Sequence, residues 1–168
     1  MSLPREMKLV EHNGTPRLAC PVISEINDIA DEWQNVTSSF DAKDAYQLHL
    51  EVDLTANSTI TLSNAQGEKY AIDVNVSTRS LSVHRNAATG ITSFAPTFSI
   101  PTMNAPLNVS GNKLSLDFYV DQSSVELIAS DGLTSITNLV FPQALYNTLS
   151  VSGASYEAKV RNLRRVWK

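Results

Sequence analysis

A period-two alternation of apolar and polar residues runs through the middle of the chain. In YQLHLEVDL, residues 46–54, apolar side chains fall on every second position and polar side chains fall between them. This pattern is typical of a β-strand that is buried on one face. Six further segments repeat it: STITLSN (58–64), KYAIDVNV (69–76), SLSVHRN (80–86), KLSLDFYV (113–120), SVELIAS (124–130) and LTSITNLVF (133–141).

Turn residues separate these segments. Asp131-Gly132 predicts a two-residue hairpin turn, because the turn that fits strand twist needs positive φ angles, and Gly111-Asn112 predicts another turn. The one candidate for a helix is DIADEWQN, residues 28–35. Strands roughly 8 to 12 residues apart, with turn residues between them, are typical of sandwiches and barrels. The sequence therefore predicts an all-β fold, a two-sheet antiparallel β-sandwich of the jelly-roll or concanavalin-like kind, with little helix.

Composition narrows the class of protein. The 168 residues fit one domain, 1–168, and 42% of them are hydrophobic while 18% are charged, so a core can form. The net charge of -4 argues against a nucleic-acid partner, and no apolar run approaches the length of a membrane span. Cys20 is the single cysteine and is expected to act as a small apolar residue. The opening MSLPREMKLV has no basic-then-apolar signal region, so we expect no export signal in it.

The end of the chain, EAKVRNLRRVWK, is locally basic. It could form a patch for an anionic partner. We prefer the interpretation that it is a last strand with a polar side that faces solvent or a neighbouring domain.

Few residues suggest a metal site. His12, His49 and His84 are well separated, and neither a His-x-x-x-His nor a Cys-x-x-Cys spacing occurs, so we expect no metal and no cofactor. The acidic pairs in FDAKDAY and DIADE could in principle offer oxygen ligands to calcium. Turn and capping roles explain those acids better, because the alternating acidic loop with its central glycine is absent.

Two tryptophans and two carboxylates are candidates for carbohydrate chemistry. Trp33 and Trp167 could stack on a sugar ring, but we expect each to fill an end of the sandwich core. Asp121 and Glu126 flank the turn DQSS and could form the carboxyl pair of a glycosidase. Because Glu126 alternates out of phase with its apolar neighbours, we expect it to point away from the core, without desolvation. We therefore predict a structural role for both acids and no catalytic residue in the chain.

The segment LDFYVDQSSVELIASDGLTSITNLVFP closely resembles the C-terminal β-sandwich of glycoside hydrolase family 32, the invertases, inulinases and levanases. Three other segments resemble the family in the same order: MSLPREMKLV, LSVHRNAATG and LRRVWK. His84 departs from the family pattern, in which an acid is common at that position. In this family, residues 1–10 would correspond to the linker or first strand that leaves an N-terminal catalytic propeller.

The resemblance implies that the catalytic residues are elsewhere. Family members cleave β-fructofuranosyl linkages with retention, using two Asp residues and a Glu in motifs of the propeller, and this chain contains none of those motifs; NDIA at Asn27 is the nearest approach. The expected function is a non-catalytic accessory domain of a fructan or sucrose hydrolase. The expected partner is the parent's own five-bladed propeller.

Alternatives remain beside this expectation. In some family members the sandwich contributes to a dimer or to the rim of the substrate cleft, and the domain could also be an autonomous fructan-binding module. An independent hydrolase with an unfamiliar site is a third class, although no buried acid is paired with a second carboxyl in the sequence. Polymer-degrading relatives are usually exported, so the resemblance favours a location outside the cytoplasm for the parent.

Overall fold

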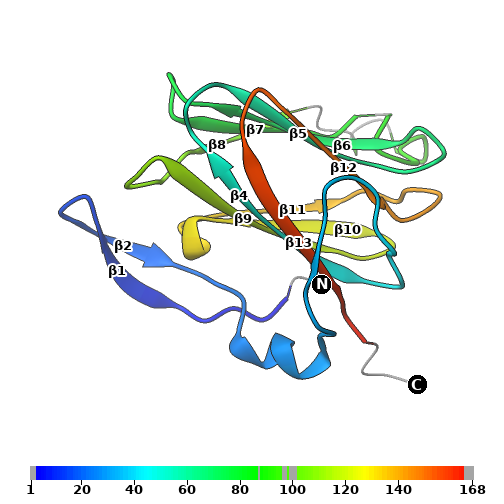
Figure 1. Cartoon of the computed structure of the whole chain (residues 1–168), viewed down its shortest axis with the longest axis horizontal. Coiled ribbons are helices and arrows are strands. Elements are labelled where there is room, and N and C mark those ends of the chain that lie inside the picture. Colours follow the sequence, from blue (N-terminus) through cyan, green and yellow to red (C-terminus); the bar gives the residue numbers. More distant parts are fainter. Residues whose placement is uncertain (1–2, 87, 96–97, 99–101, 165–168) are drawn as a thin grey trace.

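Two antiparallel sheets lie face to face and enclose the apolar positions of the alternating segments (Figure 1). The computed structural model describes residues 3–86, 88–95, 98 and 102–164. In this part of the chain, six strands form one sheet, five form the other, and two form a separate hairpin. The predicted antiparallel β-sandwich is confirmed. The described residues contain no helix long and apolar enough to cross a membrane.

The six-stranded sheet contains two consecutive hairpins, one around the turn DQSS and one around the predicted turn at Asp131-Gly132. β9 pairs with β10, and β10 pairs with β11, all antiparallel. In spatial order the strands are β11 (Thr134–Leu139), β10 (Ser124–Ala129), β9 (Lys113–Val120), β4 (Tyr46–Asp53), β13 (Tyr156–Asn162) and β3 (Gln34–Asn35). β13 includes residues 157–162 of the basic segment, so this part of it belongs to a last strand, as we preferred, while residues 165–168 lie outside the described residues.

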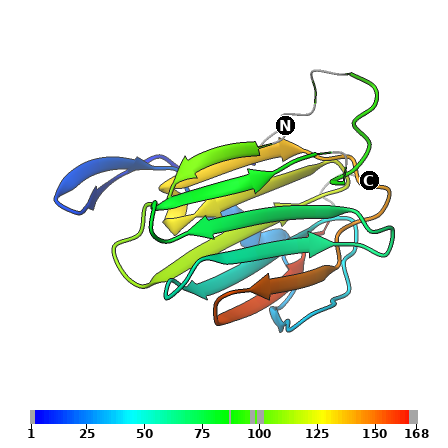
Figure 2. The same ribbon diagram turned by 90° about the horizontal axis from the view of Figure 1, so that it is seen from above.

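The five-stranded sheet covers the other side of the core, and its strands cross the view in Figure 2. In spatial order they are β12 (Thr148–Ser152), β5 (Ser58–Ser63), β6 (Lys69–Asn75), β7 (Ser80–His84) and β8 (Thr102–Pro106). The side of this sheet that faces away from the core consists mainly of small polar residues: Thr59, Thr61, Ser63, Asp73, Asn75, Ser82, His84 and Ser150. Such a surface suits contact with water.

The core between the sheets is apolar and includes three tyrosines that satisfy their hydroxyls internally. Tyr46 donates to the carbonyl of Tyr146 at 2.7 Å, and Tyr70 donates to the Asn138 side-chain oxygen at 2.7 Å. Tyr146 in turn donates to the carbonyl of Thr89. Buried tyrosines need such partners, because an unpaired buried hydroxyl costs roughly 1 to 3 kcal/mol.

Two local predictions fail. The loop between β10 and β11 has four residues rather than two, since Ala129 pairs with Thr134. It does use positive φ, at Ser130, Asp131 and Gly132, within the short 3-10 turn η2 (Ser130–Gly132). The predicted helix at 28–35 is also wrong: the 3-10 helix η1 is Ser24–Ile29, and β3 occupies the end of the predicted segment. The predicted turn at Gly111-Asn112 lies in the connection between β8 and β9, which belong to different sheets, so it does not close a hairpin.

The N-terminal hairpin lies beside the sandwich and projects beyond its end (Figures 1 and 2). It consists of β1 (Lys8–His12) and β2 (Thr15–Ala19), joined by Asn13-Gly14 with φ of 52° and 73°. Positive φ at both central residues is typical of the two-residue hairpin turn. A backbone hydrogen bond of 2.9 Å from the Cys20 amide to the Gly132 carbonyl ties the base of the hairpin to η2.

Gly132→Ala should weaken this junction. Gly132 has φ of +92°, and a Cβ there would lie 2.4 Å from the Pro21 nitrogen and 2.6 Å from the Cys20 carbonyl carbon. We expect a loss of at least 2 kcal/mol in the free energy of unfolding, about 1 from backbone strain and the rest from the clash. We also expect faster tryptic cleavage at Arg17. Urea denaturation and limited proteolysis measure these two effects.

Gly67→Ala is the matched control. Its φ of +79° brings the same strain, but no atom lies within 4 Å of the added Cβ. We expect it to cost about 1 kcal/mol and to leave cleavage at Arg17 unchanged. Equal losses in the two variants would show that the junction with residues 20–21 does not constrain the hairpin.

Candidate functional site

The outer face of the six-stranded sheet is the candidate functional surface. We define it by eleven outward-pointing side chains of its four central strands β4, β9, β10 and β13: Gln47, His49, Glu51, Ser115, Asp117, Tyr119, Glu126, Ile128, Glu157, Lys159 and Arg161. Most of these side chains are large, in contrast to the Ser and Thr side chains outside the five-stranded sheet. They make a second layer of packing and hydrogen bonds.

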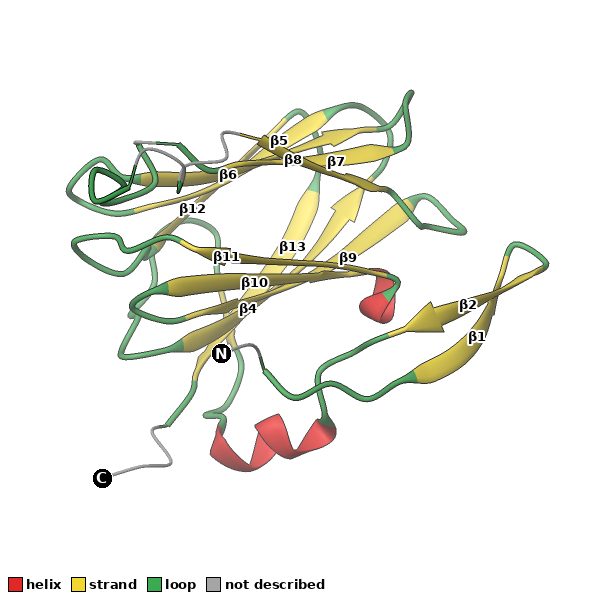
Figure 3. Cartoon of the chain, turned by 180° about the vertical axis from the view of Figure 1, so that it is seen from behind, coloured by secondary structure: helices red, strands yellow, loops and turns green. Residues whose placement is uncertain are grey.

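A second hydrophobic cluster lies on this outer face. Tyr119 and Ile128 are 9% and 4% exposed, although their positions alternate with those of the core residues. The residues that cover them come mainly from the N-terminal segment and η1, which run beneath the sheet in Figure 3. The cluster consists of Tyr119, Ile128 and Leu163, packed by Leu3, Val22, Ile26, Ala30 and Ala45. β9 and β10 are therefore buried on both faces.

Glu126 anchors the N-terminal segment on this face. Its two carboxylate oxygens accept hydrogen bonds from the Leu3 amide at 2.6 Å and from Arg5 Nη2 at 2.7 Å. Glu126 does point away from the sandwich core, but it is only 3% exposed, so the expectation that it avoids desolvation is wrong. The physical reason is that residues 3–5 cover it. A buried carboxylate needs such partners, because an unpaired buried charge is costly.

Asp121 lies in the turn that joins β9 and β10. Its Oδ1 accepts hydrogen bonds from the amides of Ser123 at 2.7 Å and Ser124 at 2.6 Å, and the residue is exposed. This is a side-chain turn in which the carboxylate substitutes for a backbone acceptor. Asp121 thus has the turn role that we expected for it.

Trp33 lies against the outer face, beside β13. The guanidinium carbon of Arg161 and the ammonium of Lys159 lie 4.3 Å and 4.8 Å from the centroid of its ring. The expectation that Trp33 fills an end of the sandwich core is therefore wrong; the residue is half-buried and its ring lies against two cations. Cation–π contacts of this kind hold the segment before β3 on the sheet. Trp167 lies outside the described residues.

A hydrogen-bonded row crosses β13, β4 and β9. Arg161 donates to Gln47 Oε1 at 2.7 and 2.9 Å, and Gln47 Nε2 donates to Asp117 Oδ1 at 2.8 Å. His49 Nδ1 lies 3.1 Å from the same Asp117 oxygen, and His49 Nε2 lies 3.4 Å from Glu51 Oε1. Burial raises the pKa of Tyr119, which adjoins this row, to about 12. Each member has a partner in the row, so it acts as a rigid polar layer.

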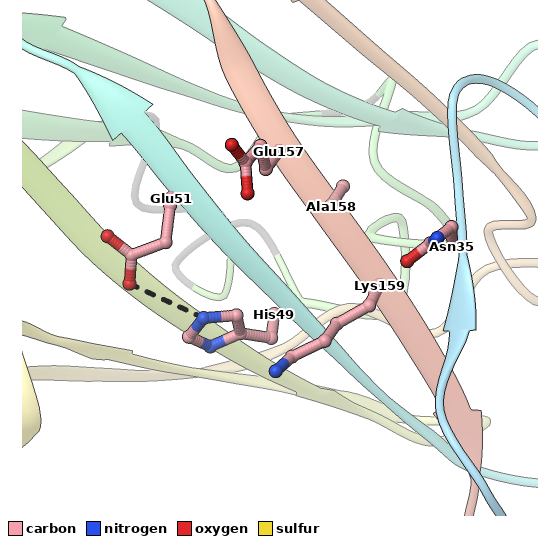
Figure 4. Close-up of a pocket in the computed structure, with 6 residues that line it drawn as sticks. All are labelled: Asn35, His49, Glu51, Glu157, Ala158 and Lys159. Atoms are coloured by element: carbon pink, nitrogen blue, oxygen red, sulfur yellow. Dashed lines mark ion pairs between the residues drawn. The ribbon is translucent and has the colours of Figure 1, made fainter.

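A shallow pocket of about 120 Å³ opens beside this row (Figure 4). In Figure 4, Glu51 extends from β4 and Glu157 from β13, and the dashed line marks the ion pair between Glu51 and His49. It is lined by Asn35, His49, Glu51, Glu157, Ala158 and Lys159. Pockets that bind small molecules are usually apolar and hold roughly 300 to 1,000 Å³, so this one is small and polar by comparison.

The other candidate residues from the sequence do not converge on this face. His84 lies on the outside of the five-stranded sheet, where its Nε2 is 2.8 Å from Asp73 Oδ2. His12 lies at the tip of the N-terminal hairpin, with Nδ1 3.1 Å from the Ser110 hydroxyl. Of the three histidines, only His49 belongs to the outer face.

Sequence reasoning missed the double burial of β9 and β10. Its signal is present in the consecutive apolar runs FYV at 118–120 and LIA at 127–129, which break strict alternation. Such runs are typical of strands that are covered on both faces. The residues that cover them, Leu3 and Arg5, could not be inferred, because they are more than 110 positions away in the sequence.

Breaking the buried ion pair should destabilise the fold. Arg5→Met leaves Glu126 buried without its cation, and we expect it to lower the free energy of unfolding by about 2 kcal/mol, since Arg5 is itself 16% exposed. Adding Glu126→Leu should recover part of that loss. Lys8→Met removes an exposed ion pair with Glu6 and should change stability by less than about 0.5 kcal/mol. A double-mutant cycle in urea measures the coupling energy between Arg5 and Glu126. If the losses of the two single variants simply add in the double variant, the two residues are not coupled and the prediction is wrong.

The hydrogen bond with Asp117 raises the pKa of His49 above its ordinary value, helped by the charges of Asp117 and Glu51 and opposed by burial and Lys159. Protonated His49 therefore stabilises the fold fully below about pH 6.5, and this contribution is lost as pH rises through the folded-state pKa. We expect Asp117→Asn to lower the pKa measured by NMR, and His49→Gln to flatten the pH dependence of unfolding. A folded-state pKa at or below 6.5 would contradict this.

Comparison with known proteins identifies the family. A family model described as "Glycosyl hydrolases family 32 C terminal" matches residues 22–167. A levanase of Bacillus subtilis (strain 168) is 28% identical in an alignment that covers 99% of this chain and 27% of the levanase. A levanase of Bacillus sp. (strain L7) is 24% identical over 98% of this chain and 19% of that protein.

Solved structures share the fold. The exo-inulinase of Aspergillus awamori superposes with a TM-score of 0.84 at 19% identity, covering 99% of this chain and 36% of the inulinase. The Bombyx mori family 32 β-fructofuranosidase gives a TM-score of 0.73 at 16% identity, over 98% of this chain and 33% of that protein. The chain spans only a fraction of each of these relatives. From the family match over most of its length, the chain belongs to the C-terminal domain family of glycoside hydrolase family 32.

Proposed function

We propose that this chain is the non-catalytic accessory domain of a longer family 32 hydrolase that cleaves fructans or sucrose. The observation that carries the proposal is the match to the C-terminal part of the family, combined with coverage of only 27% of the B. subtilis levanase. In this proposal residues 1–168 form one β-sandwich unit, and residues 1–10 lead into it from the catalytic domain.

The state of the carboxylates supports a non-catalytic role. A retaining glycosidase needs two carboxyls about 5 Å apart, one of them a general acid in an apolar pocket. Both oxygens of Glu126 already accept hydrogen bonds from residues 3 and 5, and Asp121 is engaged with its own turn. The pocket beside Glu51 and Glu157 has Ala158 as its single apolar lining residue, so it offers little desolvation.

The asymmetry between the two sheets supports a role in stabilising a neighbouring domain. The outside of the five-stranded sheet is a surface of small polar residues, whereas the outer face of the six-stranded sheet presents Trp33, His49, Lys159 and Arg161 in an ordered layer. Large, fixed side chains make good contact surfaces because little conformational entropy is lost on docking. In this proposal the catalytic domain docks on the side of the six-stranded sheet.

Two measurements test the proposal. The purified chain, incubated with sucrose, inulin and levan, should release no more fructose than a buffer blank, while an exo-inulinase serves as the positive control. In the longer protein, deletion of the chain should lower the melting temperature of the catalytic domain. Turnover by the chain that is lost in Asp121→Asn or Glu126→Gln, or a catalytic domain with unchanged melting temperature, would contradict the proposal.

The same purified chain can be tested for sugar binding. Because Arg161 and Lys159 already lie over the ring of Trp33, we expect tryptophan fluorescence to stay flat during titration with levan or inulin oligomers. A saturable change would favour an autonomous fructan-binding module instead.

A further inference from the structure

The two faces of the N-terminal hairpin differ in their side chains and in their surroundings. β1 and β2 pair in a register that places Leu9 opposite Leu18, and the period of two puts Met7 on the same side. Met7 is 76% exposed, Leu9 is 78% exposed and Leu18 is 57% exposed. We call Met7, Leu9 and Leu18 the apolar hairpin face.

The opposite face of the hairpin is the one turned toward the sandwich. Ala19 is buried there, Val10 is half-buried, and His12 lies 3.1 Å from the hydroxyl of Ser110. The backbone bond from Cys20 to Gly132 fixes the base. The hairpin is therefore held in one orientation, with its apolar face directed away from the sandwich.

Exposed apolar side chains are concentrated on the hairpin. Among the described residues, six large apolar side chains are strongly exposed, and three of them make up the apolar hairpin face. A two-stranded hairpin is marginally stable in water when nothing packs on it. A fixed hairpin that presents clustered apolar side chains to solvent is typical of an interaction surface.

The position of the N-terminal segment indicates which partner covers this face. Leu3 and Arg5 are bound to Glu126, so the chain is already fixed where any preceding domain would join it. Met7 follows Leu3 by four positions, a span of at most about 14 Å. The matched relatives are several times longer than this chain, and the matched family is the C-terminal part of those proteins. A preceding catalytic domain would thus emerge beside the apolar hairpin face.

We propose that the apolar hairpin face, Met7, Leu9 and Leu18, docks on the catalytic domain that precedes this chain in the longer protein. The inference rests on the proposed function, since it names the surface through which the accessory domain holds its neighbour. In this proposal the catalytic domain contacts both the apolar hairpin face and the outer face of the six-stranded sheet.

The test compares Leu9→Ser/Leu18→Ser in two contexts. In the isolated chain these side chains face solvent, so the melting temperature should change by no more than about 2 °C. In the longer protein, the same pair should lower the melting temperature of the catalytic domain by about 5 °C, because two apolar contacts with it are lost. Tryptic cleavage at Arg17 in the longer protein should become about tenfold faster.

Ile91→Ser is the matched control. Ile91 is 52% exposed but lies in the loop after β7, and its amide bonds to the Phe141 carbonyl at 3.0 Å. We expect it to have no effect on the catalytic domain. An equal effect of the control and the hairpin pair would overturn the inference.

The outcomes separate the inference from the proposed function. If deletion of the whole chain destabilises the catalytic domain while the hairpin pair does not, the docking surface lies elsewhere and the accessory role stands. If neither change affects the catalytic domain, both are wrong. If sedimentation shows that the isolated chain dimerises, and the hairpin pair abolishes the dimer without affecting the longer protein, the partner is a second copy and the inference is overturned.

Discussion

The buried carboxylate of Glu126 imposes the constraint on which the second layer of this protein depends. A charge that is 3% exposed on the outer face of a sheet is tolerated only where donors meet it, and the donors here are the Leu3 amide and the Arg5 guanidinium. Holding those residues in place brings the N-terminal segment across Tyr119 and Ile128 and creates the second hydrophobic cluster. It also sets where the N-terminal hairpin begins.

The two sheets therefore differ in what they can contact. Small Ser and Thr side chains outside the five-stranded sheet match water well, and the underlying strands keep a regular alternation. Outside the six-stranded sheet, the row from Arg161 through Gln47 to Asp117 fixes long side chains that would otherwise be mobile. A domain whose two sides differ in this way has one side suited to solvent and one suited to a neighbour.

The fold could be predicted from the alternation of apolar and polar residues, whereas the functional surface could be predicted only in part. Seven alternating segments became β4 to β7 and β9 to β11, because period two directly specifies a half-buried strand. The Asn13-Gly14 hairpin could also have been predicted from its turn residues, but only residues 1–10 were assigned, to a linker or first strand, and the hairpin was missed. The burial of Glu126 and the place of Trp33 depend on contacts between distant segments, which alternation within one strand does not encode.

The most direct test of this account is hydroxyl-radical footprinting of the isolated chain and of the longer protein. The account predicts that Trp33 and His49, on the outer face of the six-stranded sheet, lose reactivity when the catalytic domain is present. His84, outside the five-stranded sheet, should react equally in both. Loss of reactivity at His84, with Trp33 and His49 unchanged, would show that the neighbouring domain docks on the opposite side and would contradict the account.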